Sequence, residues 1–239
     1  MSFPCSTGKT IVHDAHQRNN MNLLSAIELE TSPDPEYCVI WLHGLGADGN
    51  DFAPIVPALK LPEKPAVRFI FPHAPKIPVT VNGGFVMPAW YDILEMEIDR
   101  RVDVEGLMGS VEAINGFVDR EIERGLKEPH IIIAGFSQGG AVAYHVALGR
   151  EKALGGLLAM STYLAGGDQI HTHRNLKIPI EIQHGLYDPV VPEHLGREAK
   201  VFLEEHGYTP NYRTYPMEHS VCPEQIVDIA HWFSTIIQA

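Results

Sequence analysis

Cysteine is scarce in this chain of 239 residues, where it occurs only as Cys5, Cys38 and Cys222. So small and irregularly spaced a set excludes a disulfide framework and indicates a reducing compartment, so we expect a cytoplasmic protein. Long hydrophobic runs are also missing. No stretch of 18 or more apolar residues occurs, so we expect no integral association with a membrane.

Basic residues are in short supply as well. The chain has 18 lysines and arginines against 30 aspartates and glutamates, which gives a formal net charge of −12. The basic residues form no cluster, and this argues against nucleic acid as a partner and against strong attraction to anionic membranes. Hydrophobic residues make up 45% of the chain and charged residues 20%, proportions that are typical of a folded enzyme with a large core.

The first twenty residues lack the apolar segment of a signal peptide. They are polar, so we expect a disordered extension over residues 1–20 and a single domain over residues 21–239. His13 and His16 in this extension have a spacing that metal ligands can have. Two histidines without further ligands are more often exposed surface residues, so no metal site is predicted.

Apolar and amphipathic segments alternate along the rest of the chain, which predicts alternating strands and helices. We expect strands at residues 26–30, 38–42, 67–71, 131–134, 155–160, 178–183 and 211–215, and helices at residues 50–59, 104–126, 140–148, 193–206 and 223–237. Residues 73–93 contain three prolines and a Gly-Gly pair and are expected to be irregular. Strands separated by helices predict an α/β fold, a mostly parallel sheet with helices on both faces.

One segment has the pattern of a catalytic turn. Gly135-Phe136-Ser137-Gln138-Gly139 lies between an apolar strand and a stretch that favours a helix. This is the arrangement of a nucleophile elbow, in which a strained turn exposes the serine oxygen at the edge of the sheet. Glycine is expected on both sides because a Cβ there would collide with neighbouring backbone. The alternative, a chance glycine turn, does not require a strand and a helix as flanks.

Three further strand ends carry polar groups that fit the same mechanism. The segment His43–Gly46 follows the strand at 38–42, Asp188 follows the strand at 178–183, and His219 follows the strand at 211–215. Taken alone, these segments could be a glycine-rich turn, a helix cap and a structural histidine. Together with Ser137 they have the Ser, Asp, His order of α/β-hydrolases. We therefore predict Ser137 as nucleophile, His219 as base and Asp188 as acid.

The same mechanism needs donors for the oxyanion and a wall for the substrate. The backbone N–H groups of Leu45 and Gln138 are the expected oxyanion donors. Phe85, Met87 and Trp90 belong to an apolar segment that is either part of the core or a loop that roofs the site. We predict the second, and we add Leu186, from the segment that carries Asp188, as a fourth substrate-binding residue.

Five motifs in order make the chain similar to a known family: Ile40–Gly49, Met87–Ile93, Gly135–Ala141, His184–Pro192 and Tyr215–His219. They resemble the carboxylesterase/acyl-protein thioesterase family, the phospholipase/carboxylesterase branch of the α/β-hydrolases, with bacterial carboxylesterases nearest in appearance. The resemblance covers about residues 22–238. It implies a compact α/β-hydrolase without a large cap domain, and hydrolysis of carboxylic esters, acyl-protein thioesters or lysophospholipids, without a cofactor or metal.

Other functions remain open at this stage. One alternative is a catalytically silent binding protein on a hydrolase scaffold, which the intact set of Ser137, Asp188 and His219 argues against. Another is a peptidase, although nothing here resembles the extra domains that restrict access of peptides. The expected partners are a small or lipid-type ester substrate or an acylated protein, and a homodimer is compatible with the sequence.

Overall fold

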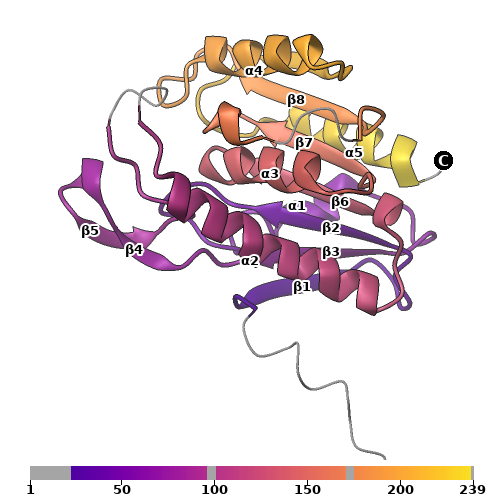
Figure 1. Ribbon diagram of the computed structural model, residues 1–239. Helices are drawn as coiled ribbons and strands as arrows, with labels where there is room; N and C mark the ends of the chain where they lie inside the picture. Colours follow the sequence, from indigo (N-terminus) through magenta and orange to yellow (C-terminus); the bar gives the residue numbers. More distant parts are fainter. Residues whose placement is uncertain (1–22, 96–100, 171–174, 238–239) are drawn as a thin grey trace, which may run out of the picture.

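The computed structural model describes residues 23–95, 101–170 and 175–237, and these residues form a central sheet with helices on both sides (Figure 1). The predictions made for residues 1–20, His13 and His16 included, lie outside the described residues. Among the described helices, none is both long enough and apolar enough to cross a membrane.

The main sheet has seven strands in the order β1-β3-β2-β6-β7-β8-β9. Its strands are β1 (Ala26–Glu30), β2 (Tyr37–Leu42), β3 (Val67–Pro72), β6 (Ile131–Phe136), β7 (Gly156–Met160), β8 (Ile180–Gly185) and β9 (Asn211–Tyr215). Strand β1 pairs antiparallel to β3, and every other neighbour in this sheet is parallel. The predicted mostly parallel sheet is confirmed. Its central strands are continuous apolar runs because both of their faces are covered.

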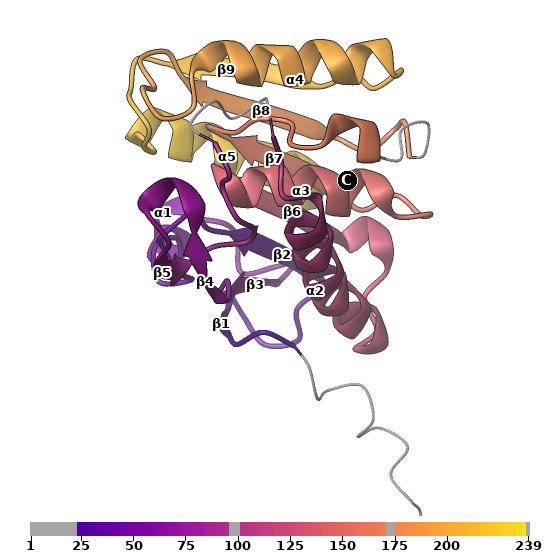
Figure 2. The same cartoon turned by 60° about the vertical axis from the view of Figure 1, so that its left-hand side comes forward.

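In the described part of the chain, five α-helices cover the two faces of the sheet (Figures 1 and 2). They are α1 (Ile55–Leu59), α2 (Val104–Glu123), α3 (Gln138–Gly149), α4 (Glu193–Glu205) and α5 (Pro223–Ile237). Side chains of α2, α3 and α4 share one apolar core with one face of the sheet, and those of α1 and α5 share the other. Alternation along β6 shows the division, since Ile131 and Ile133 lie in the first core and Ile132 and Ala134 in the second.

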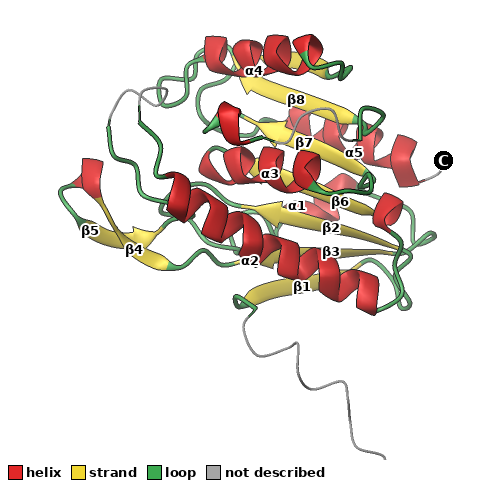
Figure 3. Ribbon diagram, in the orientation of Figure 1, coloured by secondary structure: helices red, strands yellow, loops and turns green. Residues whose placement is uncertain are grey.

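Two predicted elements were wrong, and both lie in the first half of the chain. Helix α1 begins at Ile55 instead of Asn50, because residues 50–54 form turns. The segment expected to be irregular contains a hairpin, β4 (Lys76–Val79) and β5 (Phe85–Pro88), joined through the short 3₁₀ helix η2 (Thr80–Asn82) (Figure 3). Its prolines misled the prediction. A two-stranded sheet consists of edges, where a missing N–H group is tolerated.

The parallel strands give the sheet one edge at which chemistry can gather. Strands β2, β6, β8 and β9 run in the same direction, so the segments that follow their carboxyl ends lie along the same edge. Those segments carry the oxyanion-loop residue Leu45 and then Ser137, Asp188 and His219. The fold therefore brings the sequence-predicted residues to one side of the molecule.

Candidate active site

Ser137 lies in a strained turn between β6 and α3. Its φ of 54° and ψ of −124° are unfavourable for a residue with a side chain, and the side chain is almost buried. A Cβ built on Gly135 would lie 2.4 Å from the Gly139 carbonyl oxygen, and one on Gly139 would lie 2.4 Å from the His43 carbonyl oxygen. Both glycines are therefore required by close backbone approach, as the motif predicts.

Asp188 and His219 are hydrogen-bonded to each other. His219 Nδ1 lies 2.6 Å from Asp188 Oδ2, while Asp188 Oδ1 accepts the backbone N–H groups of Val190 at 2.9 Å and Val191 at 2.8 Å. Burial raises the pKa of the Asp188 carboxyl, but these three hydrogen bonds and the charge of His219 outweigh burial and leave the pKa below its ordinary value. The Asp188 side chain is thus a carboxylate that fixes the imidazole.

The alternative role of Asp188 as a helix cap does not fit the geometry. Helix α4 begins at Glu193, and the residue before it is Pro192. The N–H groups that Asp188 accepts belong to the preceding turn. The carboxylate therefore orders its own loop and leaves its second oxygen for His219.

A cavity of about 380 Å³ contains the nucleophile and the base together. The residues that line it are Gly44, Leu45, Ala47, Asp51, Val81, Asn82, Ile93, Glu95, Phe136, Ser137, Gln138, Tyr163, Val190, Val191 and His219. Four of the five predicted catalytic and oxyanion residues are in this wall, and Asp188 reaches it through His219. The wall is apolar along much of its length, and its two charged side chains are carboxylates.

The predicted oxyanion donors lie on either side of Ser137. Gln138 is the first residue of α3, where backbone N–H groups have no partner within the helix and the helix dipole favours negative charge. Across from it, a Cβ on Gly44 would lie 3.3 Å from the Ser137 Cβ, so the loop before Leu45 packs directly against the nucleophile. The N–H of Gly46 donates to the Pro88 carbonyl at 2.8 Å and ties this loop to the hairpin.

His43 supports the oxyanion loop without being a candidate base. Its Nε2 accepts the N–H of Ala74 at 3.1 Å, so the ring hydrogen is on Nδ1, which donates to the Gly44 carbonyl at 2.8 Å. Burial is the main cause that lowers the pKa of His43, and it outweighs this hydrogen bond. His43 is a neutral, buried structural residue. Sequence reasoning used it only as part of a glycine-rich motif.

The side chain of Gln138 has a role that sequence reasoning missed. Its Oε1 accepts the backbone N–H of Trp90 at 2.9 Å, and its Nε2 donates to the Tyr91 carbonyl at 2.7 Å. The indole N–H of Trp90 donates to the His43 carbonyl at 2.8 Å. These bonds join the nucleophile turn, the oxyanion loop and the segment after β5. No local pattern distinguishes such a glutamine from a solvent-exposed one.

The predicted acyl wall needs correction. Trp90 is 2% exposed and belongs to the core, where its indole N–H donates to the His43 carbonyl and its ring lies 5.1 Å from the His43 ring. Phe85, at 67% exposed, and Leu186, at 48%, are not among the residues that line the cavity. Met87 lies beside the oxyanion loop, where its sulfur would be 3.9 Å from a Cβ on Gly46. The apolar side chains that line the cavity instead include Val81, Ile93, Phe136, Val190 and Val191.

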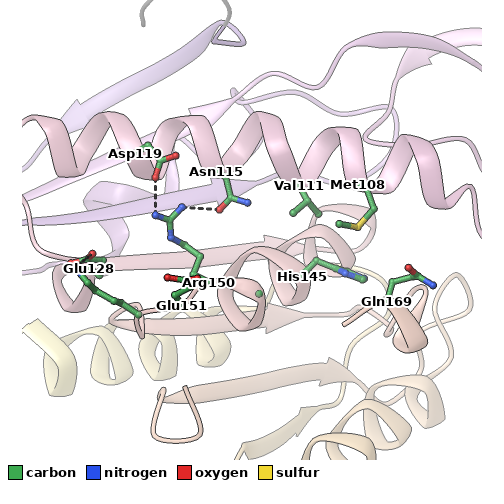
Figure 4. A pocket seen from close by; sticks show the side chains of 11 residues that line it. Met108, Val111, Asn115, Asp119, Glu128, His145, Arg150, Glu151 and Gln169 are labelled. Atoms are coloured by element: carbon green, nitrogen blue, oxygen red, sulfur yellow. Dashed lines mark hydrogen bonds and ion pairs between the residues drawn. The ribbon is translucent and has the colours of Figure 1, made fainter. Parts of the chain in front are cut away.

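A second, larger hollow of about 530 Å³ lies between α2 and the end of α3 (Figure 4). Four of its charged residues form two ion pairs, Arg150 with Asp119 at 2.7 Å and Lys152 with Glu128 at 2.9 Å, and Arg150 also donates to Asn115 at 3.1 Å. The strained serine and the hydrogen-bonded imidazole belong to the smaller cavity. We therefore take that cavity as the candidate active site.

Comparison with known proteins identifies the family of the chain. The family model described as Phospholipase/Carboxylesterase matches residues 25–237. Acyl-protein thioesterase 1 of Saccharomyces cerevisiae is 39% identical over 202 residues, which cover 80% of this chain and 89% of that protein. A probable carboxylesterase of Oryza sativa is 34% identical over 207 residues, covering 84% of this chain and 78% of the rice protein.

A solved structure shares the architecture. The crystal structure of Arabidopsis thaliana SOBER1 superposes with a TM-score of 0.79 at 30% identity, and covers 84% of this chain and 99% of its own. The described residues of this chain form a mostly parallel sheet with flanking helices and no large cap. The chain belongs to the phospholipase/carboxylesterase family of α/β-hydrolases and is a serine hydrolase that cleaves esters or thioesters.

Proposed function

We propose that Ser137 is the nucleophile of this hydrolase, with His219 as general base and acid, and Asp188 as the carboxylate that orients it. The observation that supports this best is the strained, almost buried Ser137 in the same cavity as an imidazole whose other nitrogen is 2.6 Å from a carboxylate. Neutral His219 takes the hydroxyl proton as Ser137 Oγ attacks the acyl carbon. The proton then passes to the leaving alcohol or thiol, and the acyl group stays on Ser137.

Water completes the reaction in a second round of the same proton transfer. His219 takes a proton from water, the hydroxide attacks the acyl-enzyme, and the carboxylic acid leaves as Ser137 recovers its proton. In both rounds the carbonyl oxygen becomes negative. The backbone N–H groups of Leu45 and Gln138 are the donors we assign to it, since one lies in the loop packed against Ser137 and the other at the start of α3.

For the substrate, we propose an acyl thioester on a protein, with simple carboxylic esters and lysophospholipids as further substrates. The yeast relative is named an acyl-protein thioesterase, and the apolar cavity wall of Val81, Ile93 and Val190 is suited to an aliphatic chain. The two carboxylates in the wall, Asp51 and Glu95, disfavour a negatively charged group in the cavity. The thiol of an acylated protein is uncharged when it leaves, whereas the leaving group of a lysophospholipid has a negative phosphate, so we expect the thioester to be preferred.

The test is to identify the acylated residue and the preferred leaving group. A fluorophosphonate probe followed by peptide mass spectrometry is expected to label Ser137, with labelling abolished in His219→Ala. An S-acylated peptide and oxygen esters of the same acyl chain are then compared by kcat/KM. Labelling of another serine would contradict the nucleophile assignment. Hydrolysis of the oxygen esters alone would contradict the thioester assignment and leave the nucleophile in place.

We further propose that the protein acts in the cytoplasm. Cys38 and Cys222 are free thiols in the structure, and free thiols persist in a reducing compartment. Fractionation of cells that produce the tagged protein tests this, and recovery with a secreted or organelle fraction would contradict it. A homodimer, also compatible with the sequence, is tested by light scattering, where the mass of a single chain would contradict it.

A further inference from the structure

A second histidine lies behind the Asp188–His219 pair, and the mechanism above does not use it. His184 is on β8, four residues before Asp188, and is 0% exposed. Its Nε2 lies 2.8 Å from the carbonyl oxygen of Val191. Because a carbonyl can only accept, this ring nitrogen carries a hydrogen.

The hydrogen bond from His184 continues to the carboxylate. The carbonyl of Val191 accepts from His184, and the N–H of the same residue donates to Asp188 Oδ1 at 2.8 Å. His184 thereby holds Val191, the residue at the far end of the turn that orders Asp188. Its Nε2 is also 3.8 Å from Asp188 Oδ2, the oxygen that His219 contacts at 2.6 Å. The two imidazoles face the same carboxylate.

The other ring nitrogen of His184, Nδ1, lies where a bound hydrogen would have no acceptor in the described part of the chain. Among the described residues, Nδ1 has no hydrogen-bond partner, and a Cβ on Gly196 of α4 would lie only 2.3 Å from it. A hydrogen on Nδ1 would thus be buried without an acceptor, which is unfavourable. Burial is the main cause that lowers the pKa of His184. The Val191 carbonyl, Asp188 and Glu193 act in the opposite direction, and His219 adds to the lowering.

We propose that His184 is a positioning residue of the hydrolase: a neutral imidazole, clamped by α4 at Gly196, that fixes the Asp188 turn and leaves the negative charge of Asp188 to His219. A charged imidazole at 3.8 Å would compete with His219 for that carboxylate. The inference rests on the proposed function, since it assumes that the Asp188–His219 pair is the working acid and base. It assigns no contact between His184 and the substrate.

Two substitutions at His184 and one at Gly196 test the proposal. His184→Leu removes the N–H donor, and kcat is expected to fall about 10- to 100-fold with KM nearly unchanged, because a carboxylate turn misplaced by about 1 Å costs this much. His184→Gln restores a donor and should recover most of the loss. Gly196→Ala keeps the histidine but displaces its ring, so it should lower kcat in the same way.

The matched control is Gly109→Ala in α2, where an added Cβ meets nothing within 4 Å. It should leave kcat unchanged. The kcat/KM–pH profile separates positioning from mere stability: its acid limb should shift in His184→Leu and return in His184→Gln. In the wild-type protein, imidazole ¹⁵N spectra near neutral pH should report His184 as neutral with its hydrogen on Nε2.

Three results would overturn the proposal. The first is a His184→Leu variant with lower thermal stability but unchanged kcat and pH profile, which would make His184 structural only. The second is a Gly196→Ala variant with unchanged kcat. The third is an imidazolium signal for His184 in the native protein near neutral pH. Asp188→Asn distinguishes the two levels: if it remains fully active, the proposed function itself fails, and if it is inactive while His184→Leu is active, only the positioning role fails.

Discussion

The two sides of the active-site cavity are built in different ways. On one side, Ser137, Asp188 and His219 follow strands of the seven-stranded sheet, and backbone hydrogen bonds fix the turns that carry them. On the other side is the β4–β5 hairpin, a separate two-stranded sheet whose Phe85 and Val86 are 67% and 56% exposed. The candidate catalytic residues are thus fixed to the core of the molecule, whereas most residues of the hairpin are exposed or half-buried.

This difference indicates which properties each region can change. A residue that directly follows a buried strand cannot move without disturbing the sheet. We therefore expect few substitutions to be tolerated at Ser137, Asp188 and His219. The hairpin can vary its surface while Pro88 still accepts the N–H of Gly46. We expect activity to depend on the sheet edge and substrate preference to depend on the few hairpin residues that enter the cavity.

The largest expected effect concerns the sheet edge. Ser137→Ala should lower kcat by a factor on the order of 10⁴–10⁶, because covalent catalysis is lost while the fold remains. Single-turnover and steady-state rates on an ester substrate measure this. Ser161→Ala is the matched control. Ser161 also follows a strand, is 0% exposed and has a positive φ of 44°, but it does not line the cavity. A tenth of the wild-type rate in clean Ser137→Ala would contradict the assignment.

The second effect separates the core from the surface within one segment. Trp90→Ala should lower the free energy of unfolding by about 3–5 kcal/mol, because a buried indole and its hydrogen bond to His43 are lost. Phe85→Ala, five residues earlier and 67% exposed, should change it by no more than about 0.5 kcal/mol. Urea denaturation of both variants decides this. Equal losses would mean that the hairpin is as firmly packed as the sheet.

The third effect is a pH dependence of stability that comes from the sheet edge. His43 and His184 are both buried with pKa values below the ordinary value, so below about pH 6.5 the unfolded chain binds protons that the folded chain does not. Their stability contribution is complete above that pH and is lost as the pH falls toward the folded values. Each histidine should add a slope of up to about 1.4 kcal/mol per pH unit.

Urea denaturation at pH 7.5, 6.5 and 5.5 measures that slope. His184→Gln should reduce it, because one of the two linked protons is removed. Stability that rises on acidification over this range would mean that the two histidines gain protons more readily in the folded protein, which is the opposite sign.

A fourth effect concerns substrate preference. Val81 in η2 lines the cavity, whereas Phe85 in the same hairpin does not. Each buried methylene of an acyl chain contributes up to about 0.8 kcal/mol of binding. Val81→Ala should therefore flatten the increase of kcat/KM with acyl length, and Phe85→Ala should leave it unchanged. A panel of esters from acetate to octanoate measures both, and the reverse result would restore the exposed hairpin tip as the acyl wall.

The smallest effect concerns the cavity carboxylates. Asp51→Asn combined with Glu95→Gln should raise kcat/KM a few-fold for an ester with a negative leaving group and leave a neutral one unchanged, with the gain shrinking as salt increases. Glu63→Gln is the control, because Glu63 is an exposed residue ahead of β3, at the opposite edge of the sheet. An equal gain from Glu63→Gln would show that net charge matters and position does not.

The same contrast explains what could be predicted from the sequence. The strands around Ser137 were predictable because burial on both faces demands continuous apolar runs such as Ile131–Ala134. The elbow was predictable because a Cβ at position 135 or 139 would lie only 2.4 Å from a backbone oxygen, so only glycine fits there. The apolar runs and the two glycines are both local sequence patterns, because each follows from steric and burial requirements at its own position.

The hairpin and the cavity wall have no such local sequence pattern. A proline in an edge strand looks the same in the sequence as a proline in a loop, so the sequence does not predict β4 and β5. Trp90 was assigned to the substrate side because its partners, the His43 carbonyl and the Gln138 side chain, are 47 and 48 residues away in the chain. The clamp of His184 by Gly196 is invisible for the same reason, since it depends on how α4 packs against β8.

The backbone of Ser137 has a consequence for how this activity can be lost. A residue with a side chain at φ 54° and ψ −124° costs on the order of 1–3 kcal/mol, and glycine would relieve most of this cost. A chain with glycine at this position is expected to fold more stably than the enzyme and to hydrolyse nothing. The substitution expected to inactivate the proposed enzyme is thus also expected to stabilise its fold.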